Sequence, residues 1–522
     1  MALTRLAKSS MVLLAAGSLF LLGACEDLQS DEAGPSAQPV PIEGSAAPIP
    51  EGLEQFYEQT IDWSECGTNY ECGSLTVPVD YSKPDGQTLT LELKQRTNDG
   101  SLGHLLLNPG GPGGSGIDLV ENLPQMIPHE VTDNYTLVGF DPRGVGKSTP
   151  VDCISDEEMD EERSADYEAV EEPSDADRKE IADFAHKCQV KTEEETGIPD
   201  LLDHIDTVSA AKDMDVIRAV LGDNHLNYLG YSYGTYLGAT YADLFPANVG
   251  RMVLDGAIDP SLSAADLSAG QAEGFEKALR AYVENCQAGN KCPLTGDVDN
   301  GVRQIQQFLE ATKTAPIPTS DPDRPLTYGL AMSGIIGPLY QDESWDVLTM
   351  GLDQAMKQHD GSVLLMIADL MAGREDDGSY DGNSGEVISA INCLDYPVEG
   401  DNDLWNKQAE ELKKLSPTFG ADMGYVDFAC EAWGHPSTRE RKPIHAQGSA
   451  PILIVGTTGD PATPYQWAVN LDDQLSDSEL LTWEGEGHTA FGRAGACINN
   501  AVSDYLISGT MPKEGTVCKG RN

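Results

Sequence analysis

The pentapeptide Gly230-Tyr231-Ser232-Tyr233-Gly234 is the feature that most constrains how this chain can fold. It separates a strand-like apolar run at residues 226–229 from a helix-like run at residues 235–244. Glycines at both ends let the backbone turn sharply, because they lack the Cβ atom that would clash in a tight turn. The sequence therefore predicts a strand, a sharp turn and a helix, with Ser232 held at the turn.

Short apolar runs with strand-like composition recur along the chain. They lie at residues 89–93, 105–107, 135–140, 226–229, 252–254, 452–455 and 479–483. Helix-like stretches, such as residues 207–221, lie between several of them. Strands that alternate with helices predict an α/β fold with a mostly parallel sheet covered on both faces. Ligands of such sheets bind beyond the carboxyl ends of the strands, so we expect the polar residues that follow these runs to lie together.

The strand rhythm is lost between residues 261 and 445, where helical patterns and Gly/Asp-rich breaks dominate. We interpret this segment as a large, mainly helical cap inserted between two strands of the sheet. The predicted organisation is a signal peptide (1–24), a lipidated N-terminus with a disordered tether (25–50), a core in two parts (51–260 and 446–522) and the cap (261–445). The acidic stretch at residues 156–162 is predicted to be a solvated loop.

The N-terminal segment carries Arg5 and Lys8 before an apolar stretch at residues 11–22. This stretch is too short for a spanning helix and is typical of a signal peptide. It ends in Leu22-Gly23-Ala24-Cys25, which resembles a bacterial lipobox, although an ordinary cleavage site is the alternative. The sequence therefore predicts an exported protein, lipidated at Cys25 and anchored to the outer face of the bacterial cell membrane, with partial release allowed.

The cysteine count supports export. The chain has 11 cysteines, and setting Cys25 aside leaves an even number, as an oxidised exported protein requires. Their order favours pairing between neighbours: Cys66–Cys72, Cys153–Cys188, Cys286–Cys292, Cys393–Cys430 and Cys497–Cys518. The spacing of cysteines and histidines fits no zinc site, so we expect no bound metal.

The charge balance is strongly acidic, with 86 acidic against 33 basic residues and a formal net charge of −53. Nucleic acids and anionic membrane surfaces are therefore excluded as expected partners. The field would attract a cationic substrate, although most surface acids simply keep a protein soluble. We expect contact with a membrane only through the lipid at Cys25, and we expect a monomer.

Three residues in different parts of the chain fit the requirements of a serine nucleophile. His488 lies in Gly485-Glu486-Gly487-His488, after the run that ends at residue 483, and would be the base. Asp460 follows the run at residues 452–455 and would orient the imidazole. Thr463 either hydrogen-bonds Asp460 or caps the next helix. The order Ser232, Asp460, His488 is that of α/β-hydrolases.

The glycine-rich stretch at residues 108–116 follows the strand-like run at residues 105–107. A backbone N–H in such a stretch can approach a substrate oxygen without obstruction. We predict that the N–H groups of Gly111 and Tyr233 form an oxyanion hole. The same stretch matches G-x-G-x-x-G, a dinucleotide fingerprint, but the acid that should follow, Asp133, precedes the next strand instead of ending it. We therefore predict no cofactor.

Several motifs in order resemble the prolyl-aminopeptidase-like α/β-hydrolases, and most closely the secreted tripeptidyl aminopeptidases of actinobacteria. The motifs are residues 108–116, 141–148, 230–235, 459–464 and 487–488. The resemblance covers residues 55–522. The prolyl aminopeptidases have His-Gly-Gly-Pro-Gly in the glycine-rich stretch, whereas Pro109 stands here in the place of the His. This difference favours the tripeptidyl branch over strict proline specificity.

The resemblance implies a serine exopeptidase that releases tri- or dipeptides from the free N-terminus of peptides through an acyl-enzyme. A free α-ammonium group requires carboxylates at a fixed distance from Ser232. Asp395 and Glu431 are our candidates, because a Cys393–Cys430 disulfide would bring them together. The alternatives are an esterase or lipase with the same triad and a non-catalytic peptide-binding lipoprotein.

Overall fold

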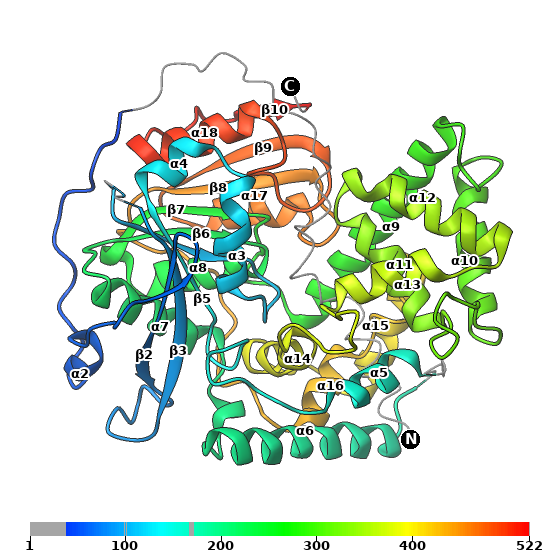
Figure 1. Cartoon of the computed structure of the whole chain (residues 1–522), viewed down its shortest axis with the longest axis horizontal. Coiled ribbons are helices and arrows are strands. Elements are labelled where there is room, and N and C mark those ends of the chain that lie inside the picture. Colours follow the sequence, from blue (N-terminus) through cyan, green and yellow to red (C-terminus); the bar gives the residue numbers. More distant parts are fainter. Residues whose placement is uncertain (1–37, 99, 101, 166–171, 521–522) are drawn as a thin grey trace.

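The computed structural model describes residues 38–98, 100, 102–165 and 172–520 (Figure 1). The predicted signal peptide and the lipidation site Cys25 lie outside the described residues. The strands are β1 (Ser64–Gly67), β2 (Tyr70–Pro78), β3 (Thr88–Arg96), β4 (His104–Asn108), β5 (Thr136–Phe140), β6 (Leu226–Tyr231), β7 (Val249–Asp255), β8 (Ile452–Gly459), β9 (Ser478–Glu486) and β10 (Val517–Lys519).

These strands form one sheet in the order β1-β2-β3-β5-β4-β6-β7-β8-β9-β10. The pairs from β1 to β3, and the pair between β3 and β5, are antiparallel. Every pair from β5 across to β10 is parallel. Each apolar run identified in the sequence forms one of these strands, which confirms the predicted mostly parallel sheet. The strand order reverses direction at β4, which lies between β5 and β6, and ligand sites lie at such a reversal.

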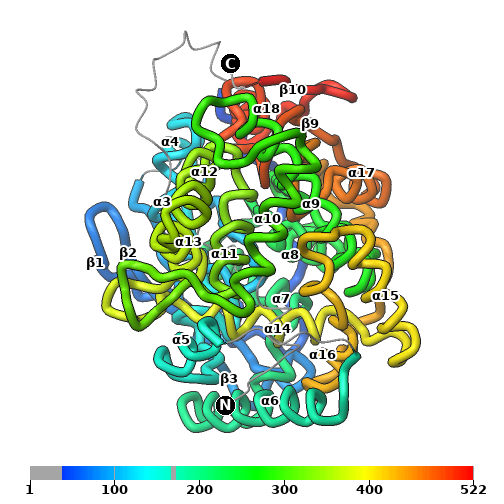
Figure 2. The backbone as a smooth tube through the Cα atoms, turned by 90° about the vertical axis from the view of Figure 1, so that its right-hand side faces the viewer, coloured from blue at the N-terminus to red at the C-terminus, as the bar shows by residue number. Residues whose placement is uncertain are grey.

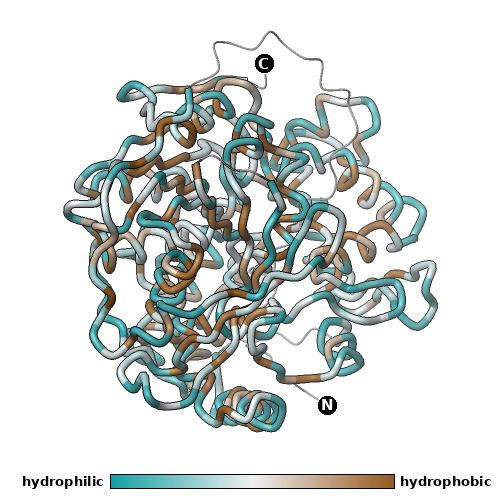
Figure 3. Tube along the Cα trace, turned by 60° about the vertical axis from the view of Figure 1, so that its left-hand side comes forward, coloured by the Kyte–Doolittle hydropathy of each residue, from teal (hydrophilic) through white to brown (hydrophobic). Residues whose placement is uncertain are grey.

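Helices cover both faces of the sheet, because successive side chains of a strand point to opposite sides. On one face, Leu106 and Tyr228 pack with α7 (Thr207–Val220), α8 (Tyr233–Leu244) and α17 (Tyr465–Gln474). On the other face, Leu105 and Leu229 pack with α3 (Gly116–Asn122), α4 (His129–Asn134) and α18 (Ala496–Ser508). Figure 3 shows the same pattern: brown apolar stretches gather in the interior and teal polar ones prevail at the periphery.

A mainly helical segment connects β7 to β8 and faces the viewer in Figure 2. Its helices are α9 (Ala264–Ala288), α10 (Val298–Thr312), α11 (Tyr328–Leu339), α12 (Trp345–Asp353), α13 (Ser362–Met371), α14 (Ser384–Asp395), α15 (Asn402–Leu415) and α16 (Val426–Trp433). Helices α9 to α13 provide most of a second apolar core. We refer to the segment as the cap. No helix in the described ranges is long and apolar enough to cross a membrane.

The prediction of a solvated loop at residues 156–162 is wrong. These residues lie in α5 (Asp156–Ser164), where the Ser155 hydroxyl accepts from the Glu158 N–H and the Glu158 side chain accepts from the Ser155 N–H. Acidic residues in the first turn also interact favourably with the helix dipole. The next helix, α6 (Asp175–Thr196), packs on the cap, since the ring of Phe184 lies 6.0 Å from that of Trp433. Helix α6, which lies between β5 and β6 in the sequence, therefore packs on the cap as an additional layer.

The end of the predicted tether, residues 40–47, is hydrogen-bonded to the core. Val40 N–H donates to the carbonyl of Ile507 (3.1 Å), and Ala47 N–H donates to the Asn248 side chain (2.8 Å). A backbone carbonyl and a side chain of the core therefore bind the backbone of residues 40–47. The prediction of a disordered tether up to residue 50 is wrong for this stretch.

Five disulfides join neighbouring cysteines in the pairs expected from the sequence. Cys66–Cys72 closes the β1–β2 hairpin, and Cys497–Cys518 ties α18 to β10. Cys286–Cys292 lies at the end of α9, and Cys393–Cys430 joins α14 to α16 within the cap. Cys153–Cys188 joins the segment after β5 to α6.

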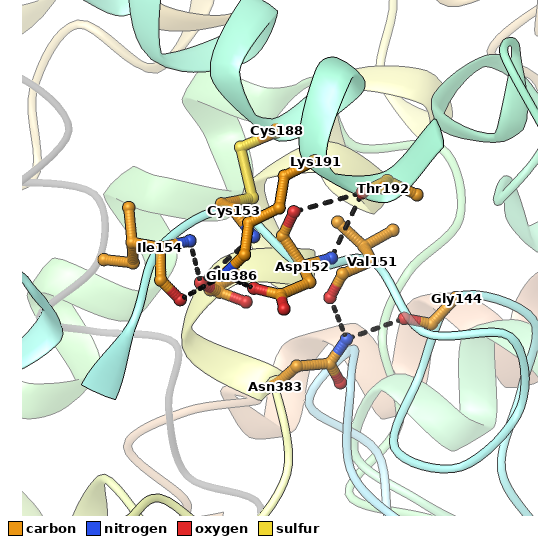
Figure 4. The surroundings of a disulfide bond; sticks show 10 residues. All are labelled: Gly144, Val151, Asp152, Cys153, Ile154, Cys188, Lys191, Thr192, Asn383 and Glu386. Carbon is orange, nitrogen blue, oxygen red and sulfur yellow. Dashed lines mark hydrogen bonds and ion pairs between the residues drawn. A yellow bond between two sulfur atoms is a disulfide. The ribbon is translucent and has the colours of Figure 1, made fainter. Parts of the chain in front are cut away.

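The start of α14 anchors the cap to the core near the Cys153–Cys188 disulfide (Figure 4). The Asn383 amide donates to the carbonyls of Gly144 (2.8 Å) and Val151 (2.7 Å). The carboxylate of Glu386 accepts from the backbone N–H groups of Cys153 (3.3 Å) and Ile154 (3.0 Å). Burial raises the pKa of Glu386 to about 7, and the two N–H donors oppose that shift.

The raised pKa of Glu386 predicts how stability depends on pH. The folded protein holds this proton more tightly than the unfolded chain, whose value is near 4.5, so stability falls as pH rises from about 4.5 to about 7. Glu386→Gln keeps an acceptor and removes the titration. The difference between the free energies of unfolding of the variant and of the wild type should therefore shift in favour of the variant as pH rises across this window, by at most about 3 kcal/mol. Urea unfolding at pH 5 and pH 7.5 measures the difference, and a constant difference would contradict the prediction.

Candidate active site

Ser232 lies between the last residue of β6 and the first residue of α8, in a backbone conformation that few non-glycine residues adopt. Its φ is 55° and its ψ is −124°. Such a conformation costs on the order of 1–3 kcal/mol and persists only where the surroundings impose it. Here the Ser232 N–H donates to the carbonyl of Asp255 (2.9 Å), and the Thr235 hydroxyl donates to the carbonyl of Ser232 (2.7 Å). The serine is therefore held out of both the strand and the helix.

The glycines around this turn lie so close to neighbouring backbone atoms that a side chain at their positions would clash. A Cβ atom on Gly230 would lie 2.5 Å from the carbonyl oxygen of Gly234. A Cβ atom on Gly110 would lie 2.8 Å from the Cβ of Ser232 and 3.0 Å from the backbone nitrogen of Tyr233. The glycine-rich loop after β4 therefore passes directly against Ser232, as the oxyanion-hole prediction requires.

Two backbone donors of the loop after β4 are engaged within the loop itself. Gly110 N–H donates to the Asn108 side chain (2.9 Å), and Gly114 N–H donates to the carbonyl of Gly110 (3.0 Å). Between them, Gly111 has a φ of 106°, a conformation that favours glycine. Tyr233 is the first residue of α8, so its N–H has no partner within the helix. The arrangement is suited to holding an anion.

Asp460 and His488 are in direct contact at the ends of β8 and β9. Nδ1 of His488 lies 2.9 Å from both carboxylate oxygens of Asp460. The carboxylate, which is fully buried, also accepts from the N–H groups of Ala462 (2.9 Å), Thr463 (2.8 Å) and Thr489 (3.2 Å). This contact assigns the proton to Nδ1 and leaves Nε2 free to accept another.

The Thr463 hydroxyl contacts the Asp460–His488 pair and does not cap the next helix. It donates to Oδ2 of Asp460 (3.0 Å) and lies 3.3 Å from Nδ1 of His488. Helix α17 begins after Pro464 and has no side-chain cap. The structure therefore selects the first of the two roles that the sequence left open.

His488 and Ser232 converge on the same part of β7. A Cβ atom on Gly256 would lie 3.1 Å from Cε1 of His488, so the imidazole packs against this glycine. The residue before it, Asp255, binds the backbone N–H of Ser232 (2.9 Å). The end of β7 is therefore a common neighbour of a serine and an imidazole that are far apart in the sequence.

Asp255 holds the loop that carries His488, a role that the sequence analysis missed. Its buried carboxylate accepts from the N–H groups of Ala490 (3.0 Å) and Phe491 (2.7 Å). Burial raises its pKa to about 6. The available signal was its position directly after the apolar run at residues 252–254, the same signal that identified Asp460.

The cap also contacts His488 through Tyr340, which follows α11. The backbone N–H of His488 donates to the backbone carbonyl of Tyr340 (2.6 Å). The phenol ring meets the imidazole edge to face, with 5.7 Å between the ring centroids. No local pattern in the sequence marks this tyrosine.

The structure does not support Asp395 and Glu431 as a pair of ligands for a substrate amino group. The Asp395 side chain has no exposed surface and accepts from the N–H (2.9 Å) and hydroxyl (2.5 Å) of Thr207. Burial raises its pKa to about 7, which opposes the negative charge that an ammonium ligand needs. The Glu431 side chain is 45% exposed and pairs with Arg178 on the surface. Although the Cys393–Cys430 disulfide forms, it leaves one acid buried and the other in solvent.

The sheet topology, the strained serine at a strand end and the order of the three residues define the chain as an α/β-hydrolase. The family described as "alpha/beta hydrolase fold" matches residues 103–366, and the family described as "TAP-like protein" matches residues 416–518. Among the described residues, no group of His, Cys, Asp and Glu could hold a metal ion.

Curated relatives match most of the chain. "Serine protease Hip1" of Mycobacterium tuberculosis is 37% identical over 486 residues, which cover 88% of this chain and 91% of that protein. "Carboxylesterase B" of the same organism is 35% identical, covering 88% of each chain. "Tripeptidyl aminopeptidase" of Streptomyces lividans is 31% identical, covering 88% of this chain and 86% of that protein. The chain belongs to the tripeptidyl aminopeptidase-like family of α/β-hydrolases and is a hydrolase, as the motifs predicted.

Substitutions at Asp460 and Thr463 should lower turnover to different extents. Asp460→Asn should lower kcat about 10⁴-fold, because the amide favours the wrong imidazole tautomer. Thr463→Val keeps the shape and the backbone N–H but removes one hydroxyl bond to the carboxylate, so we expect a loss of about 10-fold to 100-fold. Thr482→Val, at a similarly buried threonine on β9, is the control and should change kcat less than twofold. An Asp460→Asn variant with a tenth or more of wild-type kcat would refute the assignment.

Proposed function

We propose that this protein is a serine exopeptidase that releases tri- or dipeptides from the free N-terminus of peptides. In this proposal Ser232 attacks the scissile carbonyl and transfers its proton to Nε2 of His488. Asp460 stabilises the imidazolium, and the N–H groups of Gly111 and Tyr233 stabilise the oxyanion. His488 then protonates the leaving amine, and water hydrolyses the acyl-enzyme. No cofactor or metal takes part.

One observation carries the chemistry: Ser232 is held at a φ of 55° beside a glycine loop, at the same strand end against which the imidazole bound by Asp460 packs. Backbone strain of this kind is typical of functional sites, where the surroundings impose it. The choice of a peptide bond is supported by the two relatives named as a serine protease and a tripeptidyl aminopeptidase. The net charge of −53 favours a substrate with a free amino group.

An esterase is the second candidate, since one relative of similar identity is named carboxylesterase B. The same nucleophile, base and oxyanion hole would cleave an ester. A non-catalytic peptide-binding lipoprotein is the remaining alternative, and failure of a fluorophosphonate probe to label the protein would favour it.

The exopeptidase proposal predicts a strong preference for substrates with a free amine. Acetylating the N-terminus of a chromogenic tripeptide amide should lower kcat/KM by about 100-fold or more, because acetylation removes the charge that the enzyme must bind. Equal turnover of the free, acetylated and simple ester substrates would favour the esterase. Free-amine peptides of graded length then give the size of the unit released.

Ser232→Ala is the control for this experiment. It should abolish turnover and fluorophosphonate labelling while leaving the unfolding temperature within a few degrees of that of the wild type. A variant that kept peptidase activity would place the chemistry elsewhere in the protein or in a contaminant.

We also propose that the protein is exported as a monomer and anchored by a lipid at Cys25. The apolar segment before Cys25 and the five disulfides support this location. Cys25→Ala expressed in an actinobacterial host should abolish incorporation of labelled fatty acid and shift the protein from the membrane fraction. Full retention of the label by this variant would contradict lipidation at this residue.

A further inference from the structure

Arg493 ties together the residues on both sides of His488. It lies in the loop between β9 and α18, and only 8% of its side chain is exposed. Its guanidinium donates to the carbonyl of Thr489 (2.8 Å) and to the carbonyl of Glu486 (2.9 Å). One rigid, planar group therefore spans the backbone that positions the imidazole.

The same guanidinium also binds the cap. Its Nη2 atom lies 2.9 Å from a carboxylate oxygen of Asp342 and 3.1 Å from one of Glu343. These acids lie in the turn η4 (Asp342–Ser344), close after Tyr340, which accepts the His488 N–H. The loop that carries His488 is therefore attached to the cap from two directions.

Gly487 shows how closely these parts approach one another. A Cβ atom on Gly487 would lie 2.7 Å from Nη2 of Arg493 and 2.9 Å from the carbonyl oxygen of Tyr340. The backbone of the residue before His488 is therefore held between the guanidinium and the cap. A shift of either one changes the space available to the imidazole.

The charge of Arg493 depends on the cap for its neutralisation. Its guanidinium carbon lies 4.7 Å from the centre of the Trp483 ring, and within the part of the chain that the structure describes its Nε has no hydrogen-bond partner. The carboxylates that pair with it both belong to η4. If the cap moved away, a largely buried charge would lose its partners, which is costly. The position of the cap and the arrangement of the His488 loop therefore favour one another.

We infer that Arg493 is a positioning residue for His488 and that it couples the seating of the cap to the reactivity of Ser232. This inference rests on the proposed Ser232–His488 chemistry and is independent of whether the substrate is a peptide or an ester. Arg493 touches no reacting atom. It acts by holding the base, so it should affect kcat and the rate of fluorophosphonate labelling more than KM.

Arg493→Met tests the positioning role in the full-length protein. We expect kcat on a free-amine tripeptide amide to fall about 10-fold to 100-fold, as for a misplaced base, with KM within about threefold. Labelling of Ser232 by a fluorophosphonate should slow by a similar factor. Arg493→Lys keeps the charge but not the planar fork, so it should recover part of the loss. Unchanged kcat in Arg493→Met, or no recovery in Arg493→Lys, would overturn the inference.

Removal of the cap carboxylates tests the coupling. The double variant Asp342→Asn/Glu343→Gln should lower kcat in the wild-type background but cause little further loss in the Arg493→Met background. Losses that multiply in the combined variant would show that the cap acids act independently of Arg493 and would overturn the coupling.

Arg324→Met is the matched control, because Arg324 is a cap arginine with a 13% exposed side chain that pairs with Asp369 at 2.7 Å. It should lower stability without a selective loss of kcat, and an equal loss would overturn the specific role of Arg493. The Ser232→Ala variant separates the two hypotheses. Activity in Ser232→Ala refutes the proposed function, whereas an inactive Ser232→Ala with a normal Arg493→Met refutes only this inference.

Discussion

The left-handed backbone of Ser232 is the constraint on which the rest of the site depends. At a φ of 55°, a serine is strained unless its neighbours leave room for it and hold it in place. Both conditions are met by the strands on either side of β6. The loop after β4 comes within contact distance of Ser232 only because Gly110 has no side chain, and β7 provides the carbonyl of Asp255 that binds the serine N–H. The conformation of the proposed nucleophile therefore depends on the order of strands in the sheet, and a change in the pairing of β4, β6 and β7 would release it.

The parts of the site that could be predicted from the sequence are those whose signal is local. Ser232, Asp460 and His488 each follow an apolar run, and the carboxyl ends of parallel strands meet at one edge of the sheet. Asp255 follows such a run too, but it acts on backbone N–H groups, a role that no residue pattern marks. Tyr340 acts through its backbone carbonyl, and Arg493 pairs with acids about 150 residues away in the sequence. Only the folded chain brings such partners together.

Two of the failed predictions have a common cause in the high acid content of the chain. With 86 acidic residues, the position of a carboxylate in the sequence says little about what it contacts. Asp395 is buried against Thr207, and Glu431 pairs with Arg178 on the surface, although a disulfide joins their neighbours. The acidic stretch after Ser155 is a helix because that serine caps it, a local signal that the charge density obscured. Residues 40–47 have the composition of a tether, yet core side chains bind their backbone.

Both halves of the proposed catalytic apparatus border the cap, so the cap does more than cover the site. The glycine-rich loop meets α14, because a Cβ atom on Gly113 would lie 2.7 Å from the side chain of Val387. The loop of His488 meets the end of α11 and the turn η4 through Tyr340 and Arg493. The core holds the same histidine loop from the other side through Asp255. The proposed oxyanion hole and the base are therefore assembled where the two parts of the protein meet, so a movement of the cap would disturb both at once, and substrate contacts that seat the cap would also align the groups that carry out the reaction.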